Sequence, residues 1–214
     1  MFPFVTCLLT GTSFFIYYKW QQMTPRQARS NFVFSETNFY NLGQYQSLFF
    51  SPLSFENNMF FYANLPGLIY SGLLVERVCG PGALMLAYLL NCGVSAATTT
   101  TYHRQIGFHK VQQRGRLSNT NGNMTLFLAS LFTAMAPEYK LYNGSYVKIT
   151  FLFILAFYGV LFFTEHQSAE QLEKIGSTFK ASNHNETHYA AVLFGLGLGA
   201  LFRRRYAHNL RFFL

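Results

Sequence analysis

Three side chains in or beside the apolar stretches of this chain are of types that take part in acyl transfer. His188 opens an apolar stretch near the C-terminus, where an imidazole could act as a general base. Asn64 lies inside an earlier stretch, four residues after Phe60, and its amide could stabilise an oxyanion. Asn121 precedes another stretch, but an amide has no hydroxyl that a base could activate. These positions therefore offer a base and an amide donor without a nucleophile.

Each of these residues also has a structural interpretation. His188 could be an interfacial histidine at the start of a helix, bonded to water or to Asn121. Asn64 needs a hydrogen-bond partner, because a side-chain amide without one costs several kcal/mol in hydrocarbon. A hydrogen bond to a neighbouring helix would meet this need. A residual enzyme could instead use one of three hydroxyl groups near Asn121, those of Ser118, Thr120 and Thr125.

The composition indicates a membrane protein. Half of the 214 residues are apolar, 19% are aromatic and only 11% are charged, which is little polar material for a soluble surface. The chain has no aspartate, so aspartate-based intramembrane proteolysis is excluded. The net charge of +8 favours loops that face anionic lipid headgroups, and no nucleic-acid partner is expected.

Apolar stretches predict an all-α, six-helix membrane bundle that forms a single domain over 1–214. A span needs about 20 residues to cross a hydrocarbon core of about 30 Å. The third, fourth and sixth stretches are shorter, so they must tilt, extend or be shielded by neighbours. Six spans would leave both chain ends on one side. The stretches are 2–18, 59–75, 83–97, 124–136, 147–163 and 189–202.

The segments between the stretches suggest contacts with lipid. The first loop, 19–51, mixes aromatic and polar residues and is expected to lie partly in the headgroup layer. Basic residues gather in the third loop and in a C-terminal tail, 203–214, and could bind a phospholipid such as cardiolipin. These residues are Arg104, Lys110, Arg114, Arg116, Arg203, Arg204 and Arg205.

No cofactor beyond such a lipid and no metal is expected. The histidines cluster around two loops, but the chain has no His-Glu-x-x-His pattern, and no thiolates lie near them. Cys7, Cys79 and Cys92 show no Cys-x-x-Cys spacing and are assigned no chemistry.

The order of these features resembles the rhomboid superfamily of six-helix intramembrane serine proteases, over nearly the whole chain. The segment from Pro3 to Thr6 matches the Pro-x-Val-Thr pattern that opens the family's first span, and a membrane-lying first loop follows in both. Glu76, Arg77 and Gly80 match a Glu-Arg-x-x-Gly pattern at the end of the second span. The resemblance implies that Glu76 and Arg77 tie a loop to the bundle by charge-assisted hydrogen bonds.

The same resemblance implies that the catalytic machinery is degenerate. Where active members carry His-x-x-x-Asn in the second span, this chain has Phe60 and keeps Asn64. Where they carry Gly-x-Ser-Gly at the fourth span, it has Asn121 in place of the serine and keeps Gly122. In the sixth span it keeps His188. A lone base cannot supply acyl transfer, so a pseudoenzyme is predicted.

Two glycine positions of the sixth span complete the comparison. The family pattern His-x-x-Gly-x-x-x-Gly places Ala191 at the first glycine and Gly195 at the second. Gly195, Gly197 and Gly199 together provide small residues that let a neighbouring helix approach closely. The expected neighbour is the fourth span of the same chain, and the alternative is an interface with another molecule.

The resemblance implies a role in binding or packing transmembrane segments. We expect a non-catalytic accessory subunit of a large membrane complex, in the respiratory chain or the ATP synthase of the mitochondrial inner membrane. The location follows from the similarity of 30–35 and 46–55 to the mitochondrial branch of rhomboids. Two alternatives are an adaptor that recognises transmembrane helices in the secretory pathway and a residual intramembrane protease.

Overall fold

The described part of the chain is mainly helical, which confirms the all-α class there. The computed structural model describes residues 2–34, 37–55, 58–106, 139–140, 146–147 and 185–210. Its long helices coincide with the first, second, third and sixth predicted stretches, and each extends beyond the stretch that predicted it. They are α1 (Phe4–Gln22), α4 (Asn58–Cys79), α5 (Pro81–Ile106) and α9 (Asn185–Leu210). The stretch 124–136 and most of 147–163 lie outside the described residues, so the six-helix bundle stays a prediction.

The predicted first loop is largely helical and begins later than expected. Lys19 and Trp20 belong to α1, which continues to Gln22. The described part of the segment then contains four short elements: α2 (Pro25–Phe32), the π-helix η1 (Thr37–Asn41), α3 (Gln46–Phe50) and the 3-10 helix η2 (Ser51–Leu53). Phe32 and Phe34 are buried, whereas Tyr40 and Tyr45 are exposed. The segment is therefore folded onto the bundle with part of its aromatic surface outside.

A short antiparallel ladder corrects the start of the fifth predicted stretch. β1 (Tyr139–Lys140) pairs with β2 (Tyr146–Val147), so that Tyr139 faces Val147. Val147 was predicted to open a helix, but it lies in a strand. Tyrosine and β-branched valine favour a pleated backbone, and cross-strand pairing decides in favour of the strand here.

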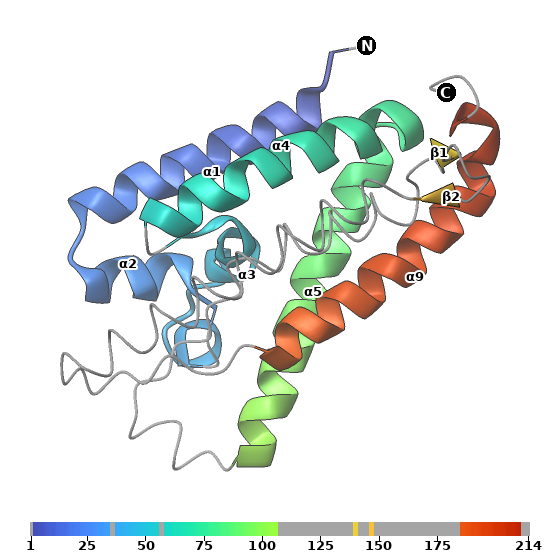
Figure 1. Cartoon of the computed structure of the whole chain (residues 1–214). Helices are drawn as coiled ribbons and strands as arrows, with labels where there is room; N and C mark the ends of the chain where they lie inside the picture. The colour runs from blue at the N-terminus through green and yellow to red at the C-terminus, as the bar shows by residue number, and fades with distance from the viewer. Residues whose placement is uncertain are drawn as a thin grey trace.

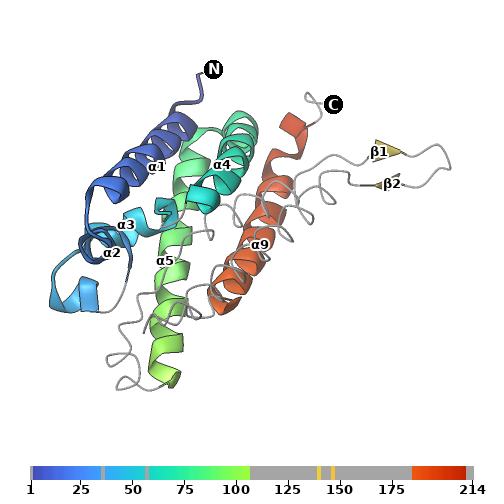
Figure 2. The ribbon, with the colours of Figure 1, turned by 60° about the vertical axis from the view of Figure 1, so that its left-hand side comes forward.

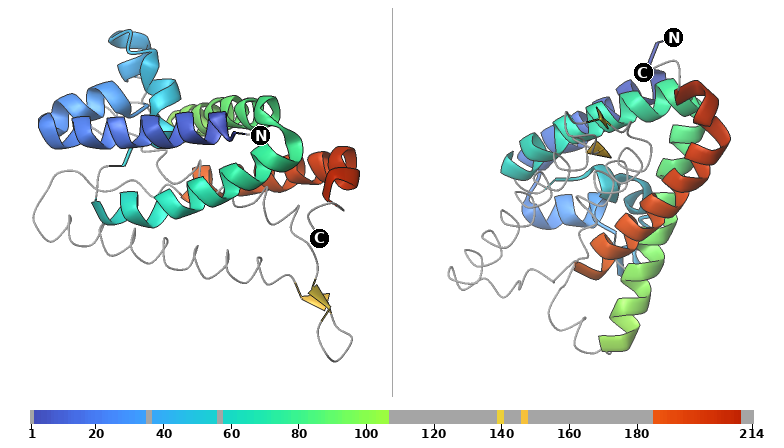
Figure 3. Two further views of the ribbon diagram at one scale, coloured as in Figure 1. Left: turned by 90° about the horizontal axis from the view of Figure 1, so that it is seen from above. Right: turned by 45° about the vertical axis from the view of Figure 1, so that its right-hand side comes forward.

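The long helices run alternately up and down. α1 and α4 lie side by side and antiparallel, and α5 returns beneath them (Figure 1). α9 packs against α5 and α4, and the views from other directions show the same order (Figures 2 and 3). The start of α1, the end of α4 and the end of α9 lie at one end of the molecule (Figure 1). We call it the terminal end. That both chain ends share one side of a membrane stays a prediction.

The turn between α4 and α5 depends on Gly80. Its φ of +89° lies in the left-handed region, where a side chain would clash with its own backbone. Its N–H donates to the carbonyl of Glu76 at 3.0 Å, which closes the last turn of α4. Pro81 then begins α5, a position where its missing N–H does no harm.

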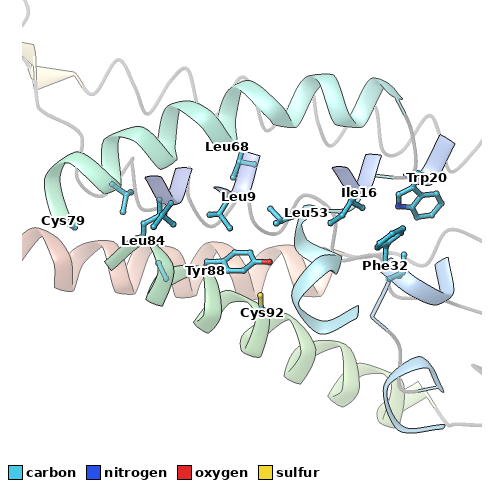
Figure 4. Packing of buried hydrophobic residues seen from close by; sticks show 14 of the residues in the cluster. Leu9, Ile16, Trp20, Phe32, Leu53, Leu68, Cys79, Leu84, Tyr88 and Cys92 are labelled. Atoms are coloured by element: carbon cyan, nitrogen blue, oxygen red, sulfur yellow. The ribbon is translucent and has the colours of Figure 1, made fainter. Parts of the chain in front are cut away.

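The core joins α1, α4 and α5 to the first-loop helices. Ile16, Leu68 and Leu84 are fully buried between the long helices, as the close view shows (Figure 4). Polar bonds attach the loop to them. Ser13 Oγ donates to the carbonyl of Leu53 at 3.1 Å, Trp20 Nε1 donates to Ser54 Oγ at 2.7 Å, and the Tyr88 hydroxyl donates to the carbonyl of Phe49.

Candidate functional site

The structure locates part of the predicted catalytic constellation. Asn64 lies on α4 with its side chain completely buried, where an amide that joins helices has to lie. Phe60 stands in the first turn of α4 and His188 in the first turn of α9, both away from the terminal end (Figure 1). Their side chains lie outside what the structure describes, as do Asn121 and Gly122.

The first long helix buries hydroxyl groups beside apolar side chains and leaves further large apolar side chains on its outer face. On α1, Thr6 and Ser13 are 3% and 0% exposed, on the face that also carries the buried apolar residues of the helix. On its opposite face, Phe4, Leu8 and Phe15 are 62%, 46% and 55% exposed. The outer face of a helix on the surface of a soluble protein is instead polar.

Helices α4 and α5 likewise bury polar side chains beside apolar ones. The buried polar side chains of α4 and α5 are Asn64, Ser71, Glu76, Asn91 and Ser95. The exposed large apolar or aromatic side chains of α4, α5 and α9 include Tyr62, Tyr70, Leu86, Leu89, Leu90, Leu193, Leu196 and Leu201. Glu76 bonds to the neighbouring helix α1, and Ser71 bonds to the carbonyl of Gly67 within its own helix. The exposed leucines would suit a hydrocarbon solvent.

Buried polar groups lower the average hydropathy of these helices. Among the described residues, one stretch, Pro81–Thr98 in α5, is long and apolar enough to cross a membrane by length and composition. An average over a window adds the buried hydroxyl and carboxylate groups to the apolar side chains of the same helix.

A buried carboxylate joins the end of α4 to the start of α1. Glu76 is 3% exposed. Its Oε1 accepts the N–H of Val5 at 2.9 Å, and its Oε2 accepts both the N–H of Thr6 at 2.8 Å and the Thr6 hydroxyl at 2.6 Å. Resemblance had suggested that Glu76 ties a loop to the bundle, but its partner is a helix start. We call these three bonds the Glu76 latch.

The latch supplies a cap that the local sequence lacks. The N-cap position of α1 is Pro3, which makes no side-chain cap bond, and the first turn holds no acidic residue. The first N–H groups of a helix have no partners within the helix, and their dipoles favour a negative charge nearby. Glu76, 70 positions away from Thr6 in the chain, provides both the acceptors and the charge.

Close packing beside the latch requires a glycine on α4. A Cβ placed on Gly72 would lie 3.0 Å from Thr6 Cγ2 and 3.1 Å from Thr6 Oγ1. A real side chain would therefore push α1 away by several tenths of an ångström. Gly72 thus permits the approach of α1 that lets Glu76 reach its partners.

The latch keeps the carboxylate charged. Glu76 follows the apolar stretch 59–75 that was predicted to span the membrane. Its burial acts to raise the pKa, but the hydrogen bonds from Thr6 and Val5 outweigh burial and bring the pKa below the ordinary value of 4.5. Glu76 is thus an anionic acceptor at neutral pH. This geometry holds helices together and offers no proton donor for catalysis.

The remaining predicted site residues divide between the two ends of the molecule. Arg77, next to Glu76, is exposed at the terminal end. The basic tail is not separate from the last helix, because α9 continues to Leu210, and Arg203, Arg204 and Arg205 are exposed on it. Arg104 lies near the end of α5, at the opposite end (Figure 1). Three predicted lipid contacts lie outside the described residues: Lys110, Arg114 and Arg116.

Helix α9 buries two of its three central glycines. Gly195 and Gly199 are buried, while Gly197 is exposed with open space around it. The described helices that contact α9 are α5 and α4. The predicted neighbour of the glycines, the fourth span, lies outside the described residues, so that contact stays a prediction.

Sequence reasoning missed the partner of Glu76. It treated the Pro-x-Val-Thr and Glu-Arg-x-x-Gly patterns as separate resemblances, although Thr6 and Glu76 bind each other. A signal was present, since Pro3 precedes a helix that has no capping residue of its own. A helix start of that kind requires an acceptor from elsewhere in the chain.

Comparisons with known proteins name no relative. A scan against protein-family models, a search of curated proteins and a search of solved structures found no match. Within the described ranges, no three histidine, cysteine or acidic side chains gather as a metal site would need. The functional argument therefore rests on the residues of this chain.

Proposed function

We propose that this protein is a non-catalytic, rhomboid-like accessory subunit of a large membrane complex. The observation that carries the proposal is that the long helices expose large phenylalanine, tyrosine and leucine side chains, while α1 and α4 bury Thr6, Ser13, Asn64 and Glu76 beside their apolar core. Such an outer surface would be contacted by lipid chains or by the transmembrane helices of neighbouring subunits. In this proposal the apolar stretches of α1, α4, α5 and α9 cross the membrane, and Glu76 lies just beyond the stretch of α4.

A structural role fits the way these helices are joined. The Glu76 latch, the tight turn at Gly80 and the buried bonds to the first loop restrain relative motion of α1, α4 and the loop. The resemblance to rhomboids, with Asn121 at the nucleophile position, supports a protein that packs rather than cleaves. The similarity of 30–35 and 46–55 to mitochondrial rhomboids supports the inner membrane of mitochondria as its location.

Separation of native complexes tests the accessory role. Membranes are solubilised in mild detergent, resolved by size without denaturation, and every protein that migrates with this chain is identified and quantified. We expect a constant ratio to the subunits of one large oxidative-phosphorylation assembly. A small particle with varying transmembrane clients would favour the adaptor, and a free monomer without stable partners would overturn the proposal.

A second experiment tests the absence of catalysis. We expect Asn121→Ser to cleave no rhomboid substrate, because Phe60 still offers no oxyanion donor and Ala191 alters the helix contact beside the base. Cleavage by this single variant would contradict the proposal. Fluorophosphonate labelling of the native chain that disappears in His188→Ala would also contradict it.

A further inference from the structure

Tyrosines from two adjoining helices meet where α1 ends and α4 begins. The Tyr17 and Tyr62 side chains share a hydrogen bond, and their ring centres are 6.2 Å apart. The Tyr17 ring also stacks on Phe61, with 4.1 Å between the ring centres and 4° between the ring planes. Tyr18, the next residue on α1, is 59% exposed, and Tyr62 is 62% exposed. We call the three tyrosines Tyr17, Tyr18 and Tyr62 the tyrosine band.

The surface becomes polar one helical turn beyond the band on both helices. Gln21 lies four residues after Tyr17 on α1, and Asn58 lies four residues before Tyr62 on α4. The two helices are antiparallel, so four residues along each of them lead to the same level, about 6 Å farther out (Figure 1). The two exposed side chains meet there, since Gln21 Nε2 donates to Asn58 Oδ1 at 3.1 Å.

The surface on the inner side of the band is apolar. Leu8, Phe14 and Phe15 on α1 are 46%, 47% and 55% exposed. A positive charge stands at the border, because Lys19 Nζ lies 5.8 Å from the centre of the Phe15 ring. From Phe15 to Gln21 the chain advances six residues, or about 9 Å along a helix. The headgroup region adds about 5–8 Å to each side of the hydrocarbon core, so the two lengths are similar.

This order of side chains is that of a membrane boundary. Tyrosine has an apolar ring and a hydroxyl tip, and it is enriched with lysine at the headgroup level. A bilayer surrounds the protein, so its boundary is a level that neighbouring helices share, as α1 and α4 do here. A protein partner would need complementarity on one face and no common level. Trp20 does not take this role, because its indole is buried and donates to Ser54 Oγ.

We propose that the tyrosine band lies in the headgroup layer of the bilayer and sets one membrane boundary of the protein. On α1 the hydrocarbon ends after Phe15 and water begins near Gln21. On α4 the boundary lies at Tyr62, inside the apolar stretch 59–75 rather than at its start. This inference rests on the proposed membrane insertion of α1 and α4, and it names the lipid layer that contacts them at this end.

Spin-label depth measurements on the full chain in phosphatidylcholine vesicles test the boundary. Cys7→Ser removes the exposed thiol, Cys79 and Cys92 are buried, and each variant then receives one new cysteine for the label. Collisions of the label with oxygen, which concentrates in hydrocarbon, and with a water-soluble nickel chelate report its depth. Melting temperatures verify that each variant is folded. The variants are Leu8→Cys, Phe15→Cys, Tyr18→Cys, Gln21→Cys, Asn58→Cys and Tyr62→Cys.

We expect the labels at Tyr18 and Tyr62 to lie at equal depth, within one helical turn, about 5 Å, of the lipid phosphates. The label at Phe15 should lie in hydrocarbon, and the labels at Gln21 and Asn58 should be open to the chelate. The depth should change by at most about 9 Å between Phe15 and Gln21. A difference of more than one turn between Tyr18 and Tyr62 would overturn the shared boundary.

The label at Leu8 distinguishes failure of this inference from failure of the proposed function. If it collides with oxygen and is shielded from the chelate while the boundary lies away from the tyrosines, only the tyrosine band is wrong. A label at Tyr18 as deep as the one at Leu8 has the same meaning. If the labels at Leu8 and Phe15 are as open to the chelate as the one at Gln21, α1 is not inserted and both proposals fail.

Discussion

Replacement of Glu76 by glutamine should loosen the start of α1. The glutamine carbonyl can still accept from Thr6, but its NH₂ group then faces the N–H of Val5, which loses its acceptor. An unmet buried donor costs about 1–3 kcal/mol, and loss of the charge at a helix N-terminus adds about 0.3–1 kcal/mol. The remaining bonds are also weaker without charge. We expect a total destabilisation of about 3 kcal/mol.

Thermal unfolding in detergent measures this effect. For a domain of this size, each kcal/mol lowers the Tm by about 2–4 °C, so Glu76→Gln should melt about 6–12 °C below wild type. Arg77→Gln is the matched control, because it removes a charge from the adjacent exposed position and should change stability by at most about 0.5 kcal/mol. Hydrogen exchange should show faster exchange of the Val5 and Thr6 amides in Glu76→Gln alone.

The pH dependence provides an independent check. Because the pKa of Glu76 is lowered in the folded protein, its stabilisation is fully present above the ordinary value of 4.5 and is lost as the pH falls through the folded pKa. The Tm difference between wild type and Glu76→Gln should therefore shrink on acidification below 4.5. If Glu76→Gln and Arg77→Gln have the same Tm at neutral pH, the latch does not stabilise the fold.

Three further perturbations probe other parts of the structure. Gly80→Ala should cost about 1–2 kcal/mol because φ is +89° there, whereas Gly82→Ala, with open space around it in α5, should leave the Tm unchanged or higher. A membrane-permeant maleimide should label the exposed Cys7 and spare both buried cysteines, and labelling of all three would contradict the packing. Trp20→Phe removes the donor to the buried Ser54 hydroxyl and should lower stability by about 2 kcal/mol, measured by thermal unfolding, while an unchanged Tm would show that this bond does not hold the loop.

The helices could be predicted because their apolar content marks them locally. Four predicted stretches overlap a helix of the structure, and no knowledge of their packing partners was needed to find them. They are 2–18, 59–75, 83–97 and 189–202. Their ends could not be placed in the same way. α1 continues through Lys19 and Trp20, and α9 continues through its three arginines, because helical backbone bonds tolerate polar side chains at a helix end.

The partners of the polar residues could not be predicted, since they depend on contacts distant in sequence. The pattern around Glu76 was recognised, but its partner is set by the packing of Gly72 against Thr6. Trp20 was expected in the headgroup layer, yet its indole is buried because Ser54 accepts its N–H. At Val147 the local apolar pattern predicted a helix, but pairing with Tyr139 across the ladder makes this residue part of a strand.

The position of the Glu76 latch has a consequence for how the chain is made. When α1 leaves the ribosome, its first turn lacks a local cap, and its acceptor is still about 70 residues from being synthesised. If α1 is inserted in the membrane as proposed, the exposed N–H groups of Val5 and Thr6 are costly in hydrocarbon until that acceptor arrives. The two helices would thus reach a stable state as an inserted pair rather than one after the other. A chain arrested before residue 76 should remain a substrate for membrane quality control, whereas one released just beyond Gly80 should be the shortest to escape it.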